Sequence, residues 1–189
     1  VEATPPPRAA LLPHIWLSDE EIRQGQRLLE QLPDKAGTPP IALHPYATHP
    51  DKAWKEAYWR QLMELFESRG IPWIVIGRGN GMEGIPASRN FTNRTSLRET
   101  CALLKSSSLL ITGDSGPMHL AGAVGTPVLA LFGPTTEEWG FFPAGPKDRV
   151  LESQLDCRPC TLHGKKHCDR NHACMQSITP EQVMRALDE

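Results

Sequence analysis

Short apolar runs alternate with helical patterns along most of this chain, and this alternation restricts the fold more than any other feature of the sequence. Four runs have the length and aliphatic content of buried strands, at residues 41–44, 73–76, 109–112 and 128–132. Strands separated by helices are typical of βαβ units, whose parallel strands form a sheet covered on both faces. We therefore predict an α/β fold, with a Rossmann-like parallel sheet and helices on both faces.

Capping residues mark where two of the helices begin. Ser18 with Glu21, and Ser96 with Glu99, have the spacing of a capping box, in which each side chain bonds the other residue's backbone N–H. The remaining elements are predicted from periodicity and turn residues. The predicted helices cover residues 18–32, 56–69, 96–105, 117–124 and 180–188, and a short strand at 89–91 and a turn at 133–135 complete the pattern.

A chain of 189 residues is most simply one domain. Residues 1–17 are rich in proline and are predicted to form an irregular lead-in or linker. We expect residues 18–189 to form the domain, with a Cys-rich loop at 156–175 and a C-terminal helix at 180–188. Because the chain begins with Val1 and not with methionine, we expect it to be a piece of a longer protein.

The composition excludes several function classes. Hydrophobic residues make up 39% and charged residues 22%, as in an ordinary globular protein. The net charge is −2 and no long basic run occurs, so a nucleic-acid partner is not expected. No apolar stretch approaches the roughly 20 residues of a transmembrane helix, and no signal-peptide layout is present at the N-terminus. Any membrane contact is therefore expected to be peripheral.

The carboxyl ends of parallel strands meet at one edge of a sheet, and ligands bind there in α/β proteins. The residues predicted to lie at this edge are His44, Gly77, 93–95, 113–116 and Gly133.

The most informative part of this edge lies in residues 111–135, ITGDSGPMHLAGAVGTPVLALFGPT. A buried strand ends at a small-residue turn, and a helix opens at Pro117, where the missing N–H costs nothing. Ser115 and Gly116 are small enough for a ligand to approach the backbone. The free N–H groups of a helix N-terminus favour an anion such as phosphate. Packing alone can also explain such a turn, so both interpretations remain open.

Two side chains of the same stretch can bond a ligand. Asp114 repels phosphate, and it is therefore expected to accept hydrogen bonds from sugar hydroxyls. His119 falls on the first turn of the predicted helix and can donate to a phosphate oxygen; a partly buried, hydrogen-bonded histidine is the alternative.

The loop after the first strand carries a candidate cation. Lys52 lies in a polar loop that also contains Thr48, and a flexible ammonium group there suits a diphosphate. The alternative is a solvated loop lysine. Trp54 and Trp59 are predicted to pack in the core and not to stack on a ligand.

The Gly-rich loop 77–84 is a weaker signal. Its glycines lack the G-x-G-x-x-G spacing of a dinucleotide-binding fingerprint and do not open directly into a helix. Glu83 can accept from ribose hydroxyls, and an ordinary surface glutamate is the alternative.

Four cysteines lie close together near the C-terminus. Cys157, Cys160, Cys168 and Cys174 can form a structural zinc site, pair as two disulfides, or remain reduced, and the spacing does not decide between these states. Their loop is basic and can face an anionic acceptor or a membrane surface, or it can simply be solvated. The isolated Cys101 is predicted to be a small buried apolar residue.

Three stretches together resemble a known family. GDSGPMHLAGAVGTPVLALFGPT, preceded by HPYATHPDKAW and followed by SITPEQVMRAL, resembles the C-terminal half of the ADP-heptose:lipopolysaccharide heptosyltransferases over about residues 40–188. Members of that family have two Rossmann-like domains that face each other across a cleft, the GT-B arrangement. The resemblance implies that this chain is the half that holds ADP-heptose, while the other half holds the lipid-linked acceptor sugar.

The resemblance also implies roles for particular residues. Asp114 would contact the heptose, and Ser115 and Gly116 would present backbone N–H groups to the diphosphate. His119 would lie near the same phosphates. Lys52 matches the phosphate-binding lysine of the family.

Three further positions follow from the resemblance. Thr48 matches a polar position in the lysine loop, although this loop looks one residue longer. Thr95, within 93–95, would flank the adenine, and Glu83 the ribose. The proposed catalytic base of the family is an aspartate in the N-terminal domain, which this chain does not contain, so no catalytic residue is predicted here.

The predicted function is therefore the nucleotide-sugar-binding domain of an inverting glycosyltransferase that adds heptose to the lipopolysaccharide inner core. No cofactor is required by this prediction. The expected partners are ADP-heptose or a related nucleotide sugar and, through the other domain, the lipopolysaccharide-core acceptor. The expected location is the cytoplasm, with the cytoplasmic face of the inner membrane as a site of peripheral contact. The alternatives are a non-catalytic nucleotide-binding module and half of a sugar-nucleotide epimerase, which would prefer uridine.

Overall fold

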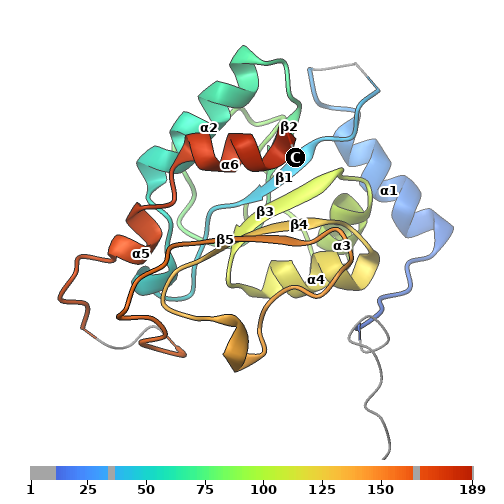
Figure 1. The fold of residues 1–189 in the computed structure, drawn as a ribbon. Helices are drawn as coiled ribbons and strands as arrows, with labels where there is room; N and C mark the ends of the chain where they lie inside the picture. The colour runs from blue at the N-terminus through green and yellow to red at the C-terminus, as the bar shows by residue number, and fades with distance from the viewer. Residues whose placement is uncertain (1–11, 34–36, 164–166, 189) are drawn as a thin grey trace, which may run out of the picture.

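The computed structural model describes residues 12–33, 37–163 and 167–188. This part of the chain forms a five-stranded parallel sheet in the order β2-β1-β3-β4-β5. The strands are β1 (Ile41–His44), β2 (Trp73–Val75), β3 (Leu109–Gly113), β4 (Val128–Phe132) and β5 (Arg149–Glu152). Helices pack on both faces of the sheet (Figure 1). The predicted α/β, Rossmann-like fold is confirmed.

Two groups of helices cover the sheet. The α-helices are α1 (Asp19–Leu29), α2 (Glu56–Ser68), α3 (Leu97–Lys105), α4 (Gly116–Val124), α5 (Ala173–Gln176) and α6 (Pro180–Asp188), and the short 3-10 helices are η2 (Pro50–Lys52) and η3 (Glu137–Trp139). Helices α2 and α6 lie on one face, and α1, α3 and α4 lie on the other (Figure 1). Both predicted capping boxes are present, at the starts of α1 and α3. None of the described helices has the length and apolar character needed to cross a membrane.

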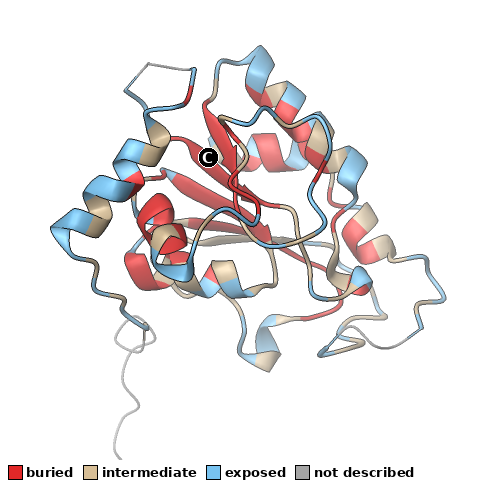
Figure 2. Cartoon of the chain, turned by 180° about the vertical axis from the view of Figure 1, so that it is seen from behind, coloured by how far each residue is buried: buried red, intermediate tan, exposed pale blue. Residues whose placement is uncertain are grey.

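Side chains alternate between the two faces of each strand and so build two cores. Ile41 and Leu43 of β1 join the core under α2 and α6, whereas Ala42 between them joins the core under α3 and α4. All four residues of β1 are buried, as are those of β4. Figure 2 shows the buried strands between helices whose outer sides are exposed. Because both faces are covered, the open end of the sheet is the place left for a ligand.

The strand order creates a switch point at the carboxyl ends of β1 and β3. From β1 the chain crosses to β2 on one side, and from β2 it returns past β1 to β3 on the other. The loops that follow β1 and β3 therefore diverge, and a crevice opens between them. Ligands of open α/β sheets bind in such a crevice.

The structure differs from the predicted elements in two places. Residues 89–91 do not form a strand: Asn90 makes an isolated bridge to Val75, and its side chain then accepts from the Thr92 N–H, which turns the chain away. The sequence analysis also missed β5. This edge strand is half-buried and reads Arg-Val-Leu-Glu, so it lacks the continuous apolar run of the inner strands.

Candidate functional site

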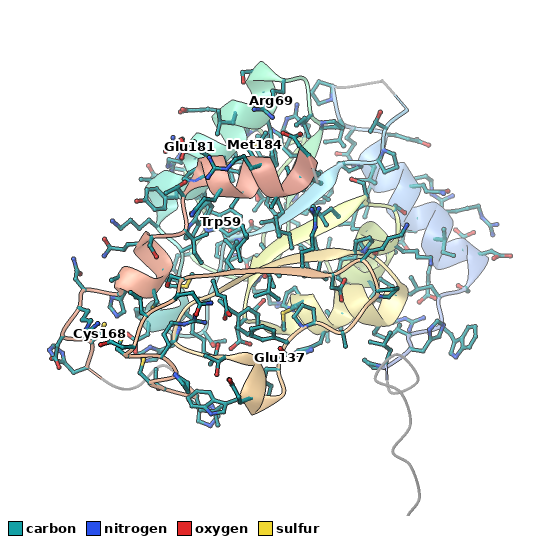
Figure 3. All side chains as sticks on the ribbon, viewed as in Figure 1. Trp59, Arg69, Glu137, Cys168, Glu181 and Met184 are labelled. Carbon is teal, nitrogen blue, oxygen red and sulfur yellow. The ribbon has the colours of Figure 1, made fainter. Side chains whose placement is uncertain are left out.

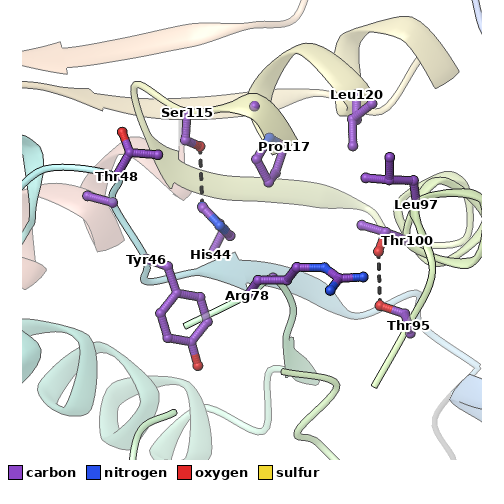
Figure 4. Close-up of a pocket in the computed structure, with 13 residues that line it drawn as sticks. His44, Tyr46, Thr48, Arg78, Thr95, Leu97, Thr100, Ser115, Pro117 and Leu120 are labelled. Atoms are coloured by element: carbon purple, nitrogen blue, oxygen red, sulfur yellow. Dashed lines mark hydrogen bonds between the residues drawn. The ribbon is translucent and has the colours of Figure 1, made fainter. Parts of the chain in front are cut away.

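A pocket of about 490 Å³ lies at the switch point (Figure 4). This volume is within the usual range for small-molecule sites. Its walls come from the loops after β1, β2 and β3 and from the starts of α3 and α4. Four predicted site residues line it, namely Thr48, Thr95, Ser115 and Gly116. The structure therefore brings together residues that lie up to about seventy positions apart in the sequence.

The start of α4 presents open backbone amides to the pocket. Gly116 is exposed, and a Cβ atom added to it would meet no atom within 4 Å. Among the described residues, no group accepts a hydrogen bond from the N–H of Ser115 or Gly116. The Ser115 side chain does not cap the helix but turns toward His44 (Figure 4). The helix N-terminus thus keeps free donors for an anion.

Lys52 reaches the same turn from the loop after β1. It ends η2, and its Nζ donates to Asp114 Oδ2 at 2.5 Å. Both side chains are close to nine-tenths buried, with 12% and 10% exposed. Thr135 Oγ1 also donates to Asp114 Oδ2, at 3.1 Å, while Oδ1 accepts no hydrogen bond from the described residues. An ammonium group carries three N–H donors, so Lys52 keeps donors beyond the one that Asp114 accepts.

His44 forms the floor of the pocket and is neutral. Its Nδ1 lies 3.0 Å from Thr112 Oγ1 and 3.2 Å from Ser115 Oγ. Burial lowers the pKa of His44 to about 4. Gly77 makes room for the ring, because a Cβ atom there would lie 2.4 Å from His44 Cδ2. The sequence analysis placed His44 at this edge without assigning it a role.

The buried imidazole makes stability depend on pH. The folded chain binds this proton only near pH 4, whereas an unfolded histidine binds it near pH 6.5. As pH falls through this interval the unfolded state gains the proton first, so folding stability drops by about 1.4 kcal/mol per pH unit. We expect the wild type to lose about 2 kcal/mol more than His44→Asn between pH 7 and pH 5. Urea unfolding at both pH values measures this, and equal losses in the two proteins would refute it.

The other four predicted residues do not line the pocket. Lys52 and Asp114 pair at the turn next to it, whereas His119 and Glu83 lie elsewhere. Pro117 and Leu120 line the pocket from one side of α4, and His119 points elsewhere because adjacent helical residues are turned by about 100°. His119 instead borders a separate cavity of about 240 Å³ beside Phe142. Glu83 is exposed in the loop after β2, and its carbonyl accepts from Arg60. Neither His119 nor Glu83 lines this pocket.

At the other end of the pocket the sequence analysis assigned only Thr95. Leu97 and Leu120 form an apolar wall, and the Thr95 and Thr100 hydroxyls bond each other at 2.9 Å beside it. Arg78 points toward these hydroxyls (Figure 4). Its position directly after Gly77, at the end of the run that contains β2, is a signal that could have identified it.

The clustered cysteines form neither of the predicted bonded states. No disulfide joins the cysteines within the described part of the chain, so the disulfide alternative is not observed. Within residues 12–33, 37–163 and 167–188, no three His, Cys, Asp or Glu side chains are placed to hold a metal ion. The zinc site suggested for Cys157, Cys160, Cys168 and Cys174 is therefore not formed. Cys101 is buried, as predicted.

A parallel sheet with a pocket at its switch point, open amides and a nearby lysine defines a Rossmann-like domain with a candidate ligand site. Residues 13–169 match the family model described as Glycosyltransferase family 9 (heptosyltransferase). The chain belongs to this family, which confirms the resemblance found in the sequence.

Curated relatives agree with this assignment. The chain is 33% identical to lipooligosaccharide heptosyltransferase 2 of Campylobacter jejuni, with 70% of this chain and 44% of the relative covered. It is 35% identical to lipopolysaccharide heptosyltransferase 1 of Pseudomonas aeruginosa, with 74% and 40% covered. The chain thus spans less than half the length of these relatives.

The fold comparison reaches further along the chain. The structure of E. coli ADP-heptose lps heptosyltransferase II matches with a TM-score of 0.74 at 24% identity, over 98% of this chain and 54% of that one. At this identity the match supports the fold alone.

Proposed function

We propose that this chain is the donor-nucleotide half of an inverting glycosyltransferase that transfers heptose from ADP-heptose to the lipopolysaccharide inner core. Family membership supports the reaction class. The E. coli protein of matching fold is itself named for ADP-heptose. The acceptor would be held by residues beyond this chain, because the curated relatives are more than twice the length that it covers. As a cytoplasmic enzyme of this kind, it would contact the inner membrane only peripherally.

One observation carries the assignment of the donor site. A nearly buried lysine and the open N-terminus of α4 meet beside a pocket large enough for a nucleoside. Lys52 Nζ and the N–H groups of Ser115 and Gly116 would bond the diphosphate. The Leu97 and Leu120 wall would hold the adenine beside Thr95, and Thr48 would line the opposite end of the pocket near Ser115.

These groups would act on the leaving group. In an inverting transfer the acceptor oxygen, whose proton would pass to a base outside this chain, bonds the anomeric carbon from one side while the bond from that carbon to the diphosphate oxygen breaks on the other. Negative charge then accumulates on the departing ADP. Preorganised donors aimed at this charge lower the barrier because they need little rearrangement during the reaction. Asp114 Oδ1 would accept from a heptose hydroxyl, since Oδ2 already accepts from Lys52 and Thr135.

Calorimetry with free nucleotides tests this proposal. We expect the chain to bind ADP in the micromolar to millimolar range and to bind UDP at least tenfold more weakly. A preference for UDP would favour the epimerase alternative. Absence of ADP binding at millimolar concentration would contradict the proposed donor site. Binding of ADP without heptose transfer by the full-length protein would favour a non-catalytic module.

A further inference from the structure

His172, in the Cys-rich loop (residues 156–175), contacts the loop that carries Lys52. Its Nε2 donates to Asp51 Oδ1 at 2.7 Å. Asp51 directly precedes Lys52 within η2 and is 8% exposed. The other carboxylate oxygen, Oδ2, is buried without a hydrogen bond, although His49 Nδ1 lies 3.4 Å away. The hydrogen bond from His172 is thus a main support of a nearly buried carboxylate.

Arg158, in the same loop, supports the partner of Lys52. Its side chain is 4% exposed and donates to the carbonyls of Gly133, Ser153 and Thr135, the last at 2.9 Å. Its Nη2 also pairs with Glu152 at 2.7 Å. The Thr135 hydroxyl in turn donates to Asp114. Arg158 therefore fixes the turn from which Asp114 receives its second hydrogen bond.

The segment behind these two residues is anchored to the sheet and to α2. Met175 of α5 packs so closely on Gly133 that a Cβ atom there would lie 2.4 Å from its Sδ. Trp54 Nε1 donates to the Ile178 carbonyl at 2.8 Å, and Tyr58 donates to the Gln176 carbonyl at 3.2 Å. Figure 1 shows α5 beside the end of the sheet where the Lys52 loop lies, and Figure 3 shows Cys168 farther out. These contacts thus hold the C-terminal end of the Cys-rich loop in place close to the site.

We propose that His172 and Arg158 are positioning residues that hold the Lys52–Asp114 pair in the geometry that receives a diphosphate. His172 acts on Lys52 through Asp51, and Arg158 acts on Asp114 through Thr135. A displacement of about 1 Å in a charged donor is enough to weaken a preorganised site. This inference rests on the proposed function, and it gives the Cys-rich loop a role that does not require a metal ion or a disulfide.

The test compares two ligands that share a nucleoside. ADP reaches Lys52 with its diphosphate, whereas adenosine does not. We expect His172→Ala to weaken ADP binding about three- to tenfold in calorimetry and to leave adenosine binding, followed by NMR titration, unchanged. His172→Gln retains an N–H donor for Asp51 and should restore most of the ADP affinity.

Arg170→Ala is the matched control. Arg170 lies in the same loop and pairs with Asp156, but both side chains are largely exposed, and within the described residues neither forms a hydrogen bond or ion pair with the Lys52 loop. This variant should bind ADP as the wild type does. In hydrogen–deuterium exchange, the peptide covering residues 48–54 should exchange faster in His172→Ala than in Arg170→Ala, with or without nucleotide.

Three outcomes would overturn the inference. His172→Ala could match Arg170→Ala in ADP affinity and in exchange. His172→Ala could lose affinity for ADP and for adenosine to the same extent, which would indicate a general loosening of the fold and not a positioning role. Finally, a wild-type chain that does not bind ADP would remove the proposed function, and this inference would fall with it. If the wild type binds ADP and His172→Ala binds it with the same affinity, this inference is wrong while the proposed function stands.

Discussion

Replacing Lys52 by methionine is expected to weaken ADP binding by about 10- to 100-fold. A hydrogen bond to a charged group contributes about 1.5–3 kcal/mol, and Lys52 would donate at least one to the diphosphate. The substitution also leaves Asp114 with its negative charge nearly buried, and that charge repels the phosphates. The affinity for ADP should therefore fall by more than the loss of one hydrogen bond alone would cause. Calorimetry with ADP measures the effect.

Two further variants distinguish the loss of the Lys52 charge from an effect on folding. Lys55→Met removes an exposed lysine of the same loop and should leave ADP affinity unchanged. The double variant Lys52→Met/Asp114→Asn removes the uncompensated carboxylate, and its melting temperature should recover relative to Lys52→Met alone, because an unpaired buried charge is costly. An ADP affinity of Lys52→Met within twofold of the wild type would show that Lys52 does not contact the diphosphate.

Replacing Trp59 by alanine is expected to lower the free energy of unfolding by about 3–5 kcal/mol. Trp59 lies on α2, is 2% exposed, and meets the ring of Trp54 edge-on with a centroid distance of 4.9 Å. Figure 3 shows it between the sheet and α6. Truncation would leave a cavity that the surrounding helices cannot close. For a chain of this size we expect the melting temperature to fall by about 6–20 °C.

Glu64→Ala, on the exposed side of the same helix, is the control and should change stability by less than about 0.5 kcal/mol. Trp59→Phe retains most of the packing and removes an indole N–H that has no partner in the core, so its cost should be much smaller than that of alanine. A loss of under 1 kcal/mol in Trp59→Ala would mean that this core is less tightly packed than the structure indicates. The sequence-based expectation that both tryptophans pack in the core is confirmed by their burial.

Much of the fold could be predicted because it is encoded locally. Buried parallel strands need continuous apolar runs, so β1, β3 and β4 were recognisable, and Ser18 and Ser96 marked their helices through the capping box. The missed strand β5 lies at the sheet edge, where pairing with one neighbour tolerates charged residues. Residues 89–91 looked like a strand, but the Asn90 side chain ends the pairing after one bridge.

The site was predictable only as far as its location. Strand direction places every loop that follows a strand at the same edge, so the Lys52 loop and the turn at Ser115 were expected there. The rotation of single side chains was not predictable in the same way. His119 faces another cavity because Pro117 and Leu120 occupy the pocket side of α4. His44 is neutral because it is buried beneath the pocket, and no local sequence pattern indicates that burial.

The parallel α/β architecture, the helix starts and the small-residue turn before α4 are encoded locally, because they depend on neighbours a few positions away. The meeting of polar groups at the site depends on the packed fold. Lys52 finds Asp114 across 62 positions, and His172 finds Asp51 across 121. Such pairs depend on which strands become adjacent and how tightly the layers pack, and that information is distributed over both cores.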